Sequence, residues 1–587
     1  MIPMVRQSNC HSAFQKGTWY LIFGNRLGWK LMILILSFIA ACFGILAPYF
    51  QKKFIDHLQG VATNDHPVQL IILAFICLLF GQLLYQFTQL LSTKEALIAQ
   101  NLIGQKIYHK ILNLRADSIS RRSMGEIVSL YSTDAPGATI YLEQTLPQGA
   151  STLFPLLIAP FAIWKMVNIP LMPTLFFMFL FSAINTTLAF RQSRFFFNFK
   201  QLAAERAGLV VEWIQNMRVL RILNWMIPFE SRIFDKRKIE TKNRVQMVTN
   251  GQVMNAISSS VTFFINAVAI YTFIQFKTES ISSSELFALL WILGVFLTRP
   301  FRQMPWFFTF AFDAWTSMKR IQQFLSIENK PIIIKDTEPT PKNKIKTVPA
   351  IEIKNLNLQI DHSTILENID LTISEKEFIA IIGEVGSGKS MLLLSLLGET
   401  GFTANQFRVF GNADVSTFKK HFAFVPQEGF IMSASLRENV QFQYDCSHDQ
   451  DEHIRRSLLK AQFGPDLVNM NGGLDSIIGE RGVNLSGGQR QRVSLARVTL
   501  ADAPIVLLDD CLSAVDIDTE HKLVNELLLE SWKDKTRIIA THRLSILEKV
   551  DRIIFLADGK IKAIGSFDEL AKSCPEFNDF RMTHERN

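Results

Sequence analysis

Long apolar stretches alternate with polar ones through the first half of the chain. Six of them run with few charges: 29–50, 69–91, 146–164, 170–190, 253–276 and 284–308. About 20 helical residues, rising roughly 1.5 Å each, cross a hydrocarbon core of about 30 Å. The pattern therefore predicts a helical domain that crosses a membrane six times.

The polar stretches between these spans differ in length and charge. Those after the second and fourth spans, 92–143 and 191–250, are long, and the others are short. The second long stretch contains twelve lysines and arginines but five acids. An excess of positive charge marks cytoplasmic loops, so both long loops and both termini are expected in the cytoplasm. The membrane is the plasma (inner) membrane if the chain is bacterial. Residues 1–28 are expected to form a cytoplasmic N-terminal segment, because they lack the apolar core of a cleavable signal peptide.

The pattern changes after the sixth span, and the predicted transmembrane domain covers 29–325. Residues 326–350 contain four prolines and five lysines without apolar periodicity, which is typical of a linker. From 351 to 587, short Val/Ile-rich runs alternate with helical segments, which predicts an α/β domain with a largely parallel sheet. Two runs, 505–508 and 537–540, are candidate buried strands. Asp558 and Gly559 are predicted to form the turn of a hairpin.

Composition narrows the class of protein. A hydrophobic fraction of 48% and a mean hydropathy of +0.17 fit a chain that lies partly in lipid. The net charge of +8 comes without a basic stripe interleaved with aromatics, so no nucleic-acid partner is expected. The six cysteines are isolated, which argues against a zinc site and favours a reducing compartment.

Residues 383–390, Gly-Glu-Val-Gly-Ser-Gly-Lys-Ser, lie between an apolar run that predicts a strand and one that predicts a helix. Glycines let the backbone turn tightly, so that successive N–H groups point at phosphate oxygens at a helix N-terminus. Lysine adds charge for the terminal phosphates, and serine is placed to ligate Mg²⁺. The predicted nucleotide-binding residues are Gly383, Glu384, Val385, Gly386, Ser387, Gly388, Lys389 and Ser390.

A second phosphate-binding candidate is Leu-Ser-Gly-Gly-Gln at 485–489, again before a predicted helix. This pentapeptide resembles the signature of the ABC ATPase family. Other segments resemble that family's Walker B strand (505–510), D-loop (513–516), Q-loop (Gln427) and switch histidine (His542), in the family's order. The resemblance implies that Ser486, Gly487, Gly488 and Gln489 contact ATP. It further implies that Ser390, Gln427 and Asp509 hold Mg²⁺, and that Asp510, His542 and Gln427 are catalytic.

The six-span region is similar to the transmembrane domain of ABC exporters. That resemblance implies short coupling helices at 115–124 and 225–234, docked on ATPase domains. Residues 479–489 and 507–516 resemble the multidrug-resistance-associated (C) subfamily, whose members usually have two such halves in one chain, whereas this chain has one. In the family, ATP lies between the P-loop of one domain and the signature of another. A homodimer, or a pair with a homologous half-transporter, is therefore expected, with membrane lipid around it.

Two residues depart from the family pattern. Most exporters have glutamate after the Walker B aspartate, whereas this chain has Asp510, and a carboxylate misplaced by about 1 Å can cost roughly a hundredfold in rate. Slow ATP hydrolysis is expected. The aromatic residue that usually stacks on adenine is replaced by Ile360, unless Ile360 is ordinary strand core. Adenine specificity stays open.

The leading interpretation is ATP-driven export by a dimer of half-transporters, and two questions stay open beside it. Residues 302–306, with 321–325 beyond them, resemble the sixth span and the following segment of the cystic fibrosis chloride channel, so an ATP-gated channel is an alternative. Arg299 and Arg302 either line a cationic pathway or snorkel and form packing salt bridges. Peptide, lipid, drug and organic anion all remain possible substrates.

Overall fold

The computed structural model describes residues 17–60, 66–119, 124–167, 171–276, 282–294, 299–335, 348–360, 363–478 and 485–585. Two compact units make up the chain. The first contains Met1–Asn113 and Arg122–Ile327, and the second contains Leu114–Arg121 and Glu328–Asn587. The predicted division into a transmembrane and an ATPase domain follows nearly the same boundary, except for Leu114–Arg121.

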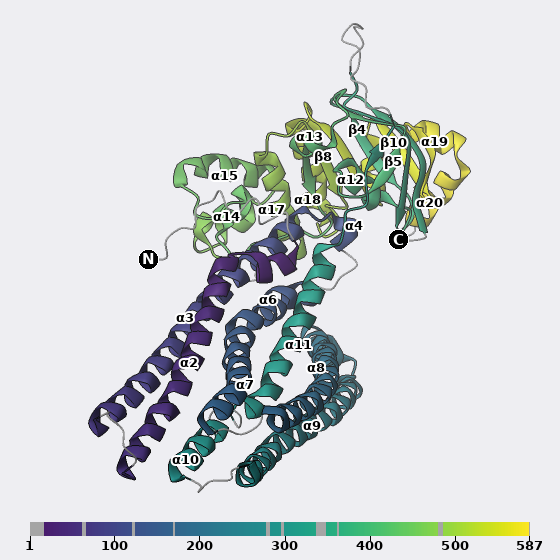
Figure 1. Cartoon of the computed structure of the whole chain (residues 1–587). Coiled ribbons are helices and arrows are strands. Elements are labelled where there is room, and N and C mark those ends of the chain that lie inside the picture. Colours follow the sequence, from purple (N-terminus) through teal and green to yellow (C-terminus); the bar gives the residue numbers. More distant parts are fainter. Residues whose placement is uncertain are drawn as a thin grey trace. The chain divides into compact units, whose positions relative to one another are not determined.

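The described part of the first unit is helical (Figure 1). Its α-helices are α2 (Leu27–Leu58), α3 (Pro67–Asn113), α5 (Met124–Ser129), α6 (Ala135–Ile140), α7 (Leu146–Val167), α8 (Leu171–Ile222), α9 (Met226–Phe276), α10 (Ser283–Ile292) and α11 (Arg299–Leu325). Short π-helical turns are η2 (Tyr20–Gly24), η3 (Leu130–Asp134) and η4 (Tyr141–Thr145). The last two connect α5, α6 and α7 into one nearly continuous helical path.

Three helical segments of the described residues are long and apolar enough to cross a membrane: Leu27–Leu58, Pro67–Asn113 and Gly125–Met166. They contain the first three predicted spans. The fourth and fifth predicted spans form parts of α8 and α9, which continue through the polar stretch 191–250. The sixth is divided between α10 and α11 by residues outside the described part of the chain. Six spans therefore stay a prediction.

Small residues bring helices of the first unit close together. A Cβ on Gly149 of α7 would lie 2.5 Å from the Phe307 ring of α11. A Cβ on Gly137 of α6 would lie 2.6 Å from the Ser317 hydroxyl, also on α11. Real Cβ atoms do not approach other atoms so closely, so a larger residue at either position would force the Phe307 ring or the Ser317 hydroxyl to move.

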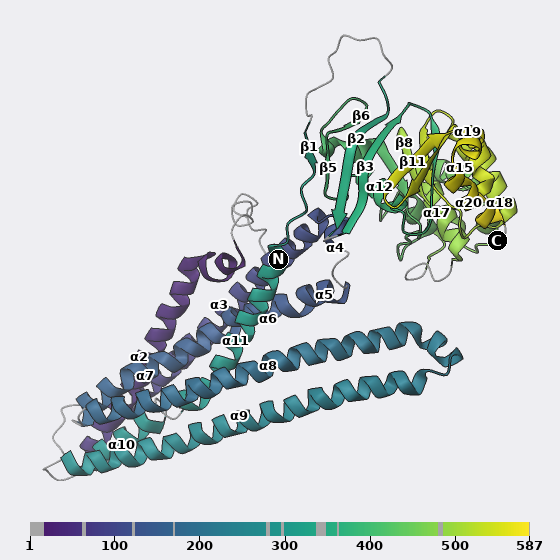
Figure 2. The ribbon, with the colours of Figure 1, turned by 90° about the vertical axis from the view of Figure 1, so that its right-hand side faces the viewer.

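Helices α8 and α9 form a long antiparallel hairpin, which Figure 2 shows from the side. Glu240 of α9 is 2% exposed and accepts hydrogen bonds from Arg206 of α8, at 2.6 Å, and from Arg237. Lys200 of α8 pairs with Asp313 of α11. These ion pairs hold the polar halves of the two helices together and connect them to α11.

Residues 225–234 do not form the separate short helix that the resemblance implies, and their coupling role stays a prediction. The chain turns at 223–225, where Asn224 has a left-handed φ of 58°, and α9 begins at once at Met226. Pro228 is the third residue of α9, where its missing N–H would have no intrahelical partner, so the helix continues through it. Exposed apolar side chains gather at this tip, including Ile222 (83%), Trp225 (62%) and Ile227 (77%).

The second unit is built on two sheets. The larger has the order β11-β10-β4-β9-β8-β7, from β4 (Phe378–Ile382), β7 (Phe422–Val425), β8 (Ile505–Asp509), β9 (Thr536–Ala540), β10 (Arg552–Ala557) and β11 (Lys560–Gly565). Its strands are parallel except for the β10–β11 pair. The smaller sheet contains β1 (Ile333–Ile334), β2 (Ile351–Ile360), β3 (Ser363–Ile373), β5 (Phe402–Ala404) and β6 (Gln406–Val409).

Helices complete this unit. They are α4 (Ala116–Ile119), α12 (Lys389–Leu396), α13 (Val415–Phe418), α14 (Leu436–Gln441), α15 (Asp451–Lys460), α16 (Gly464–Val468), α17 (Gly487–Leu500), α18 (Ile517–Lys522), α19 (Phe567–Ser573) and α20 (Pro575–Glu585). A π-helical segment, η10 (Leu523–Ser531), follows α18 directly.

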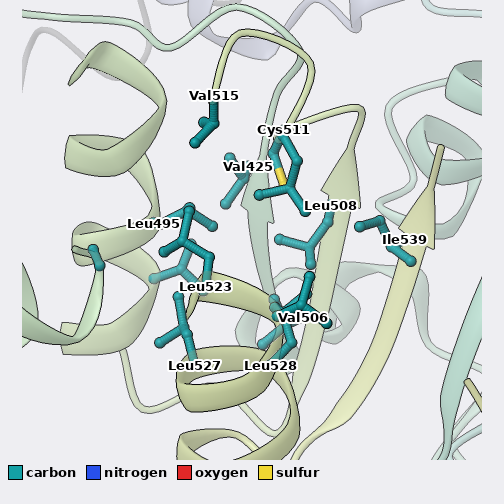
Figure 3. Close-up of a cluster of buried hydrophobic side chains, with 14 of the residues drawn as sticks. Val425, Leu495, Val506, Leu508, Cys511, Val515, Leu523, Leu527, Leu528 and Ile539 are labelled. Carbon is teal, nitrogen blue, oxygen red and sulfur yellow. The ribbon is translucent and has the colours of Figure 1, made fainter. Parts of the chain in front are cut away.

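Sequence predictions for the sheet are confirmed. Every residue of β8 and β9 is buried, and both strands are parallel to their neighbours within the sheet. Asp558 and Gly559, with φ of 50° and 73°, turn the hairpin between β10 and β11. Figure 3 shows side chains of β8, α17 and η10 meeting in one apolar core, where Cys511 is fully buried among them. This core fixes the residues that follow β8.

Segment Leu114–Arg121, which contains α4, belongs to the second unit although it follows α3 in sequence. The Asp117 carboxylate accepts a 3.1 Å hydrogen bond from the Gly401 N–H, and the Arg115 guanidinium donates to the Lys330 carbonyl at 2.6 Å. Part of the predicted linker is ordered here, because β1 pairs with β5. The position of α4 agrees with a coupling segment at 115–124, in which 120–123 lie outside the described residues.

Candidate functional site

The P-loop connects β4 to α12, as the sequence predicts. Gly383, Gly386 and Gly388 have φ of 150°, 88° and 103°, values that L side chains rarely adopt. A Cβ on Gly383 would lie 2.0 Å from the Leu556 carbonyl oxygen of β10. Glycine is therefore required both for the turn and for the approach of β10. Val385 projects fully into solvent.

One cavity of about 480 Å³ gathers most of the predicted site residues. Lys389, whose ammonium donates to the carbonyls of Gly383 and Glu384 at 2.8 Å, lines it. So do residues from the P-loop, from the ends of β8 and β9 and from the segment after β7: Gly383, Val385, Gly386, Gly388, Ser390, Met391, Gln427, Asp509, Asp510, Ala540, Thr541 and His542. The carboxyl ends of parallel strands thus meet at the N-terminus of α12, which suits binding of an anion.

Two acidic residues close the cavity beyond the P-loop. The Ser390 hydroxyl donates to the Asp509 carboxylate at 2.9 Å. Together with the Gln427 side chain, these oxygens are donors of the type that Mg²⁺ prefers, so the residues present fit that ion. Asp510 lies 3.2 Å from His542 Nδ1. Its backbone is left-handed, with φ of 45°, and its N–H donates to the Ala540 carbonyl at 2.9 Å.

Burial sets the charge balance of this cavity. Burial raises the pKa of both carboxyl groups, Asp509 and Asp510. The Ser390 hydroxyl partly offsets this rise for Asp509, and His542 and Arg543 partly offset it for Asp510. Burial also lowers the pKa of the Lys389 ammonium, although both aspartates act to raise it. The buried charges in the cavity are only partly balanced by their neighbours. The two carboxylates are therefore suited to bind a divalent cation, and the ammonium is suited to bind a phosphate.

The signature segment forms the N-terminus of α17. Ser486 and Gln489 form a capping box, in which the Ser486 N–H donates to the Gln489 side chain at 2.7 Å and the Gln489 N–H donates to the Ser486 hydroxyl at 3.2 Å. A Cβ on Gly488 would lie 2.8 Å from the Ala514 carbonyl oxygen, so glycine lets the segment after β8 pack closely. Of the described residues, none from Leu485 to Gln489 lines the cavity.

Of the two alternatives for Ile360, the structure favours the one in which it is ordinary strand core. Ile360 does not line the cavity but packs on the core of the smaller sheet, as the strand-core alternative expected, and Ile365 of β3 lines the cavity instead. Both alternatives for Arg299 and Arg302 stay open, since these side chains lie outside the described residues.

Sequence reasoning did not find the side chains that connect the predicted motifs. Gln491, which is 3% exposed, accepts a hydrogen bond from the Ala514 N–H at 3.2 Å and donates to the Gln427 carbonyl at 3.3 Å. Arg543 donates to the carbonyls of Ser513 and Val515. Their positions close to a motif in the sequence could have pointed to these residues, since Gln491 lies two residues after the signature and Arg543 follows His542.

A second cavity, of about 490 Å³, lies beside the segment that carries Gln427. Exposed aromatic side chains, Phe430 (59%) and Phe442 (57%), line it with Phe424, and the Arg497 guanidinium lies 4.9 Å from the centre of the Phe442 ring. We call it the aromatic groove. Its apolar lining fits a protein segment better than a nucleotide.

Comparisons with known proteins agree with this architecture. Residues 30–301 match the family model described as ABC transporter transmembrane region, and residues 366–513 match the one described as ABC transporter. A bacterial Atm1-family ABC exporter, solved with ATP bound, shares the fold with a TM-score of 0.80 and 17% identity. The match covers 95% of this chain and 98% of that one.

The curated relatives include C-family ABC transporters of plants. ABC transporter C family member 13 of rice is 28% identical over 92% of this chain, and C family member 6 of Arabidopsis thaliana is 26% identical over 95%. The ABC-type transporter cicA of Emericella nidulans is 30% identical over 66%. The chain spans about a third of the length of these relatives, namely 35%, 37% and 29%.

Proposed function

Since the chain belongs to the ABC transporter family, we propose that it is an integral membrane protein that uses ATP to export a substrate as a dimer of half-transporters. Two copies are favoured over a pair with a homologous half-transporter, because one chain carries both the P-loop and the signature segment. The proposal includes six spans, with both termini in the cytoplasm, where ATP is available.

The observation that supports this proposal is the one-sided cavity. The P-loop, Gln427, Asp510 and His542 line it, whereas the signature segment, the other predicted phosphate-binding surface, does not. A second subunit that supplies its own signature segment would complete two equivalent sites related by a twofold axis.

Each residue then has a role in phosphoryl transfer. Backbone N–H groups of the P-loop and the Lys389 ammonium bind the β- and γ-phosphates. Asp510 orients the attacking water, and His542 donates to the γ-phosphoryl group as charge develops there. Ser486, Gly487 and Gly488 of the partner close the site and exclude water. Ser390, Gln427 and Asp509 would hold Mg²⁺, which neutralises charge on the transferred phosphoryl group when bound.

Paired inactive variants test the shared site. Lys389→Ala removes the P-loop charge and leaves the signature intact, whereas Gly487→Asp disables the signature and leaves the P-loop intact. Each variant alone should lack ATPase activity. A dimer isolated with two affinity tags, one variant per subunit, has one composite site with both halves intact, so about half of the wild-type turnover should return. No recovery would contradict the shared site, and co-purification of a different half-transporter would favour the heterodimer.

Coupling between domains uses two surfaces in this proposal. One is α4, held to the ATPase unit through Asp117. The other is the apolar tip of the α8–α9 hairpin, which we place in the aromatic groove of the second subunit because both surfaces are exposed and apolar.

A disulfide cross-link tests the second surface. Trp225→Cys and Phe442→Cys should together form a disulfide that gives a dimer on a non-reducing gel. Each single variant is the control, and a cross-link confined to the monomer would contradict an exchange between subunits.

The cargo is best approached through the ATPase. In lipid nanodiscs, compounds from a panel of peptides, lipids, drugs and organic anions should stimulate turnover where they bind the pathway. Uphill, ATP-dependent flux into inverted vesicles supports a pump, whereas single-channel conductance in a planar bilayer would support the channel alternative.

A further inference from the structure

We infer that Arg543, held by the buried carboxylate of Glu520, is a positioning residue that fixes His542 against the segment after β8. The inference rests on the proposed function, because it assigns to this pair a share of ATP turnover. Neither residue lines the nucleotide cavity, and the charge of Arg543 also acts directly on the Asp510 carboxyl, whose pKa it lowers. Arg543→Lys keeps that charge and therefore separates it from positioning.

The pair forms a closed, hydrogen-bonded unit. Glu520 of α18 is 4% exposed, and its carboxylate pairs with the Arg543 guanidinium and accepts a 2.6 Å hydrogen bond from Ser545. A carboxylate this buried is costly unless its acceptor positions are filled, and here two partners fill them. Arg543 is thereby fixed in one orientation.

From this orientation the guanidinium reaches the D-loop, residues 513–516. Its Nη2 donates to the Ser513 carbonyl at 3.1 Å and to the Val515 carbonyl at 3.4 Å. On the other side of the same loop, Gln491 donates to the Ser513 hydroxyl at 3.3 Å and accepts from the Ala514 N–H at 3.2 Å. The D-loop is held between the helix that begins at the signature and the residue that follows His542.

Both catalytic candidates, Asp510 and His542, lie on segments that contact Arg543 or the D-loop. Arg543 adjoins His542 in the chain, and its N–H donates to the Thr541 hydroxyl at 3.1 Å. The Ser513 hydroxyl donates to the Asp510 carbonyl at 2.9 Å. Since Asp510 and His542 lie 3.2 Å apart, a rotation of either segment would separate them. A planar guanidinium can hold a carboxylate and two carbonyls at once, whereas a lysine ammonium is a point charge on a flexible stem.

Steady-state ATPase kinetics on the full chain in nanodiscs test this role. Glu520→Gln keeps the shape but removes the charge that fixes Arg543, and Arg543→Lys keeps the charge but loses the fork. Both should lower kcat roughly ten- to a hundredfold while the KM for ATP changes less than about twofold, because misplacement of about 1 Å costs on that order.

Glu377→Gln is the matched control. Glu377 also pairs with an arginine, Arg552, which donates to the Thr372 carbonyl at 2.7 Å, but this pair lies at the opposite end of β4. The control should lose comparable thermal stability and keep kcat.

A second readout separates positioning from folding. In a His542→Ala background, Glu520→Gln should cause a smaller fold-loss of kcat than in the wild type, because one of the two groups it positions is absent. Additive losses, or an unchanged kcat in Glu520→Gln beside an active wild type, would overturn the inference alone. A wild-type protein without magnesium-dependent turnover would overturn the proposed function and this inference with it.

Discussion

Extending Asp510 by one methylene should accelerate ATP hydrolysis. In the folded chain its carboxylate lies 3.2 Å from His542, at the end of β8, and faces the cavity next to Lys389. Asp510→Glu moves the carboxylate outward by about one carbon–carbon bond, roughly 1.5 Å. Because a displacement of about 1 Å can change the rate on the order of a hundredfold, kcat should rise ten- to a hundredfold, or about 1.4 to 2.7 kcal/mol in the barrier.

Backbone strain at position 510 should lower the stability of the folded variant but should not lower its kcat. Asp510 has a left-handed φ of 45°, which aspartate tolerates better than glutamate. The added strain lowers stability by about 1 kcal/mol or less. It is present both in the ATP-bound state and in the transition state, so it cancels from kcat. A faster but slightly less stable enzyme is the expected result.

The assay is phosphate release from the purified chain in nanodiscs, with kcat and the KM for ATP measured separately. Asp510→Asn should lose at least about a hundredfold in kcat, because it removes the carboxylate that orients water. Asp551→Glu is the control, since Asp551 accepts the Phe378 N–H at the other end of β4. Unchanged turnover in Asp510→Asn would show that Asp510 is not the catalytic carboxylate. An inactive Asp510→Asn with an unaccelerated Asp510→Glu would refute the distance argument alone.

Ion pairing and helix packing each make one further prediction. Arg437 holds the pKa of the Asp451 carboxyl at about 2, below its ordinary 3.8, so the stability from this pair is present above pH 3.8 and lost as the pH falls toward 2. Between pH 4 and pH 2, the Tm of wild type should therefore fall more steeply than that of Arg437→Met, and parallel slopes would contradict the pairing. Gly149→Ala should lower the Tm by several degrees because its Cβ meets the Phe307 ring, whereas Gly208→Ala, with no atom within 4 Å, should leave it unchanged or raised. Equal effects of the two substitutions would contradict close packing of α7 on α11.

The sequence alone determined those features that depend on neighbours along the chain. Apolar length identified the first three candidate spans, because a helix long enough to cross lipid must be apolar over consecutive residues. The P-loop, the buried strands and the Asp558–Gly559 turn follow from glycine placement and Val/Ile runs over a few residues. The order of motifs likewise established the ABC resemblance.

The polarity of the sequence did not predict where a helix ends when the helix continues from lipid into water. The polarity of residues 191–250 predicts a loop with a separate coupling helix, whereas α8 and α9 continue through these residues and are interrupted at 223–225 alone. Backbone hydrogen bonds close within one turn of helix, whether the surrounding solvent is lipid or water, and ion pairs such as Arg206–Glu240 stabilise the polar part.

The tertiary structure decided which motifs meet. It placed Asp510 beside His542, excluded Leu485–Gln489 from the cavity, and included α4 in the ATPase unit through Asp117. It also revealed Glu520 and Arg543, which lie 23 residues apart in the sequence and belong to no phosphate-binding motif. Contacts of this kind depend on how strands are ordered in a sheet, and strand order is set by burial across the whole domain rather than by local spacing.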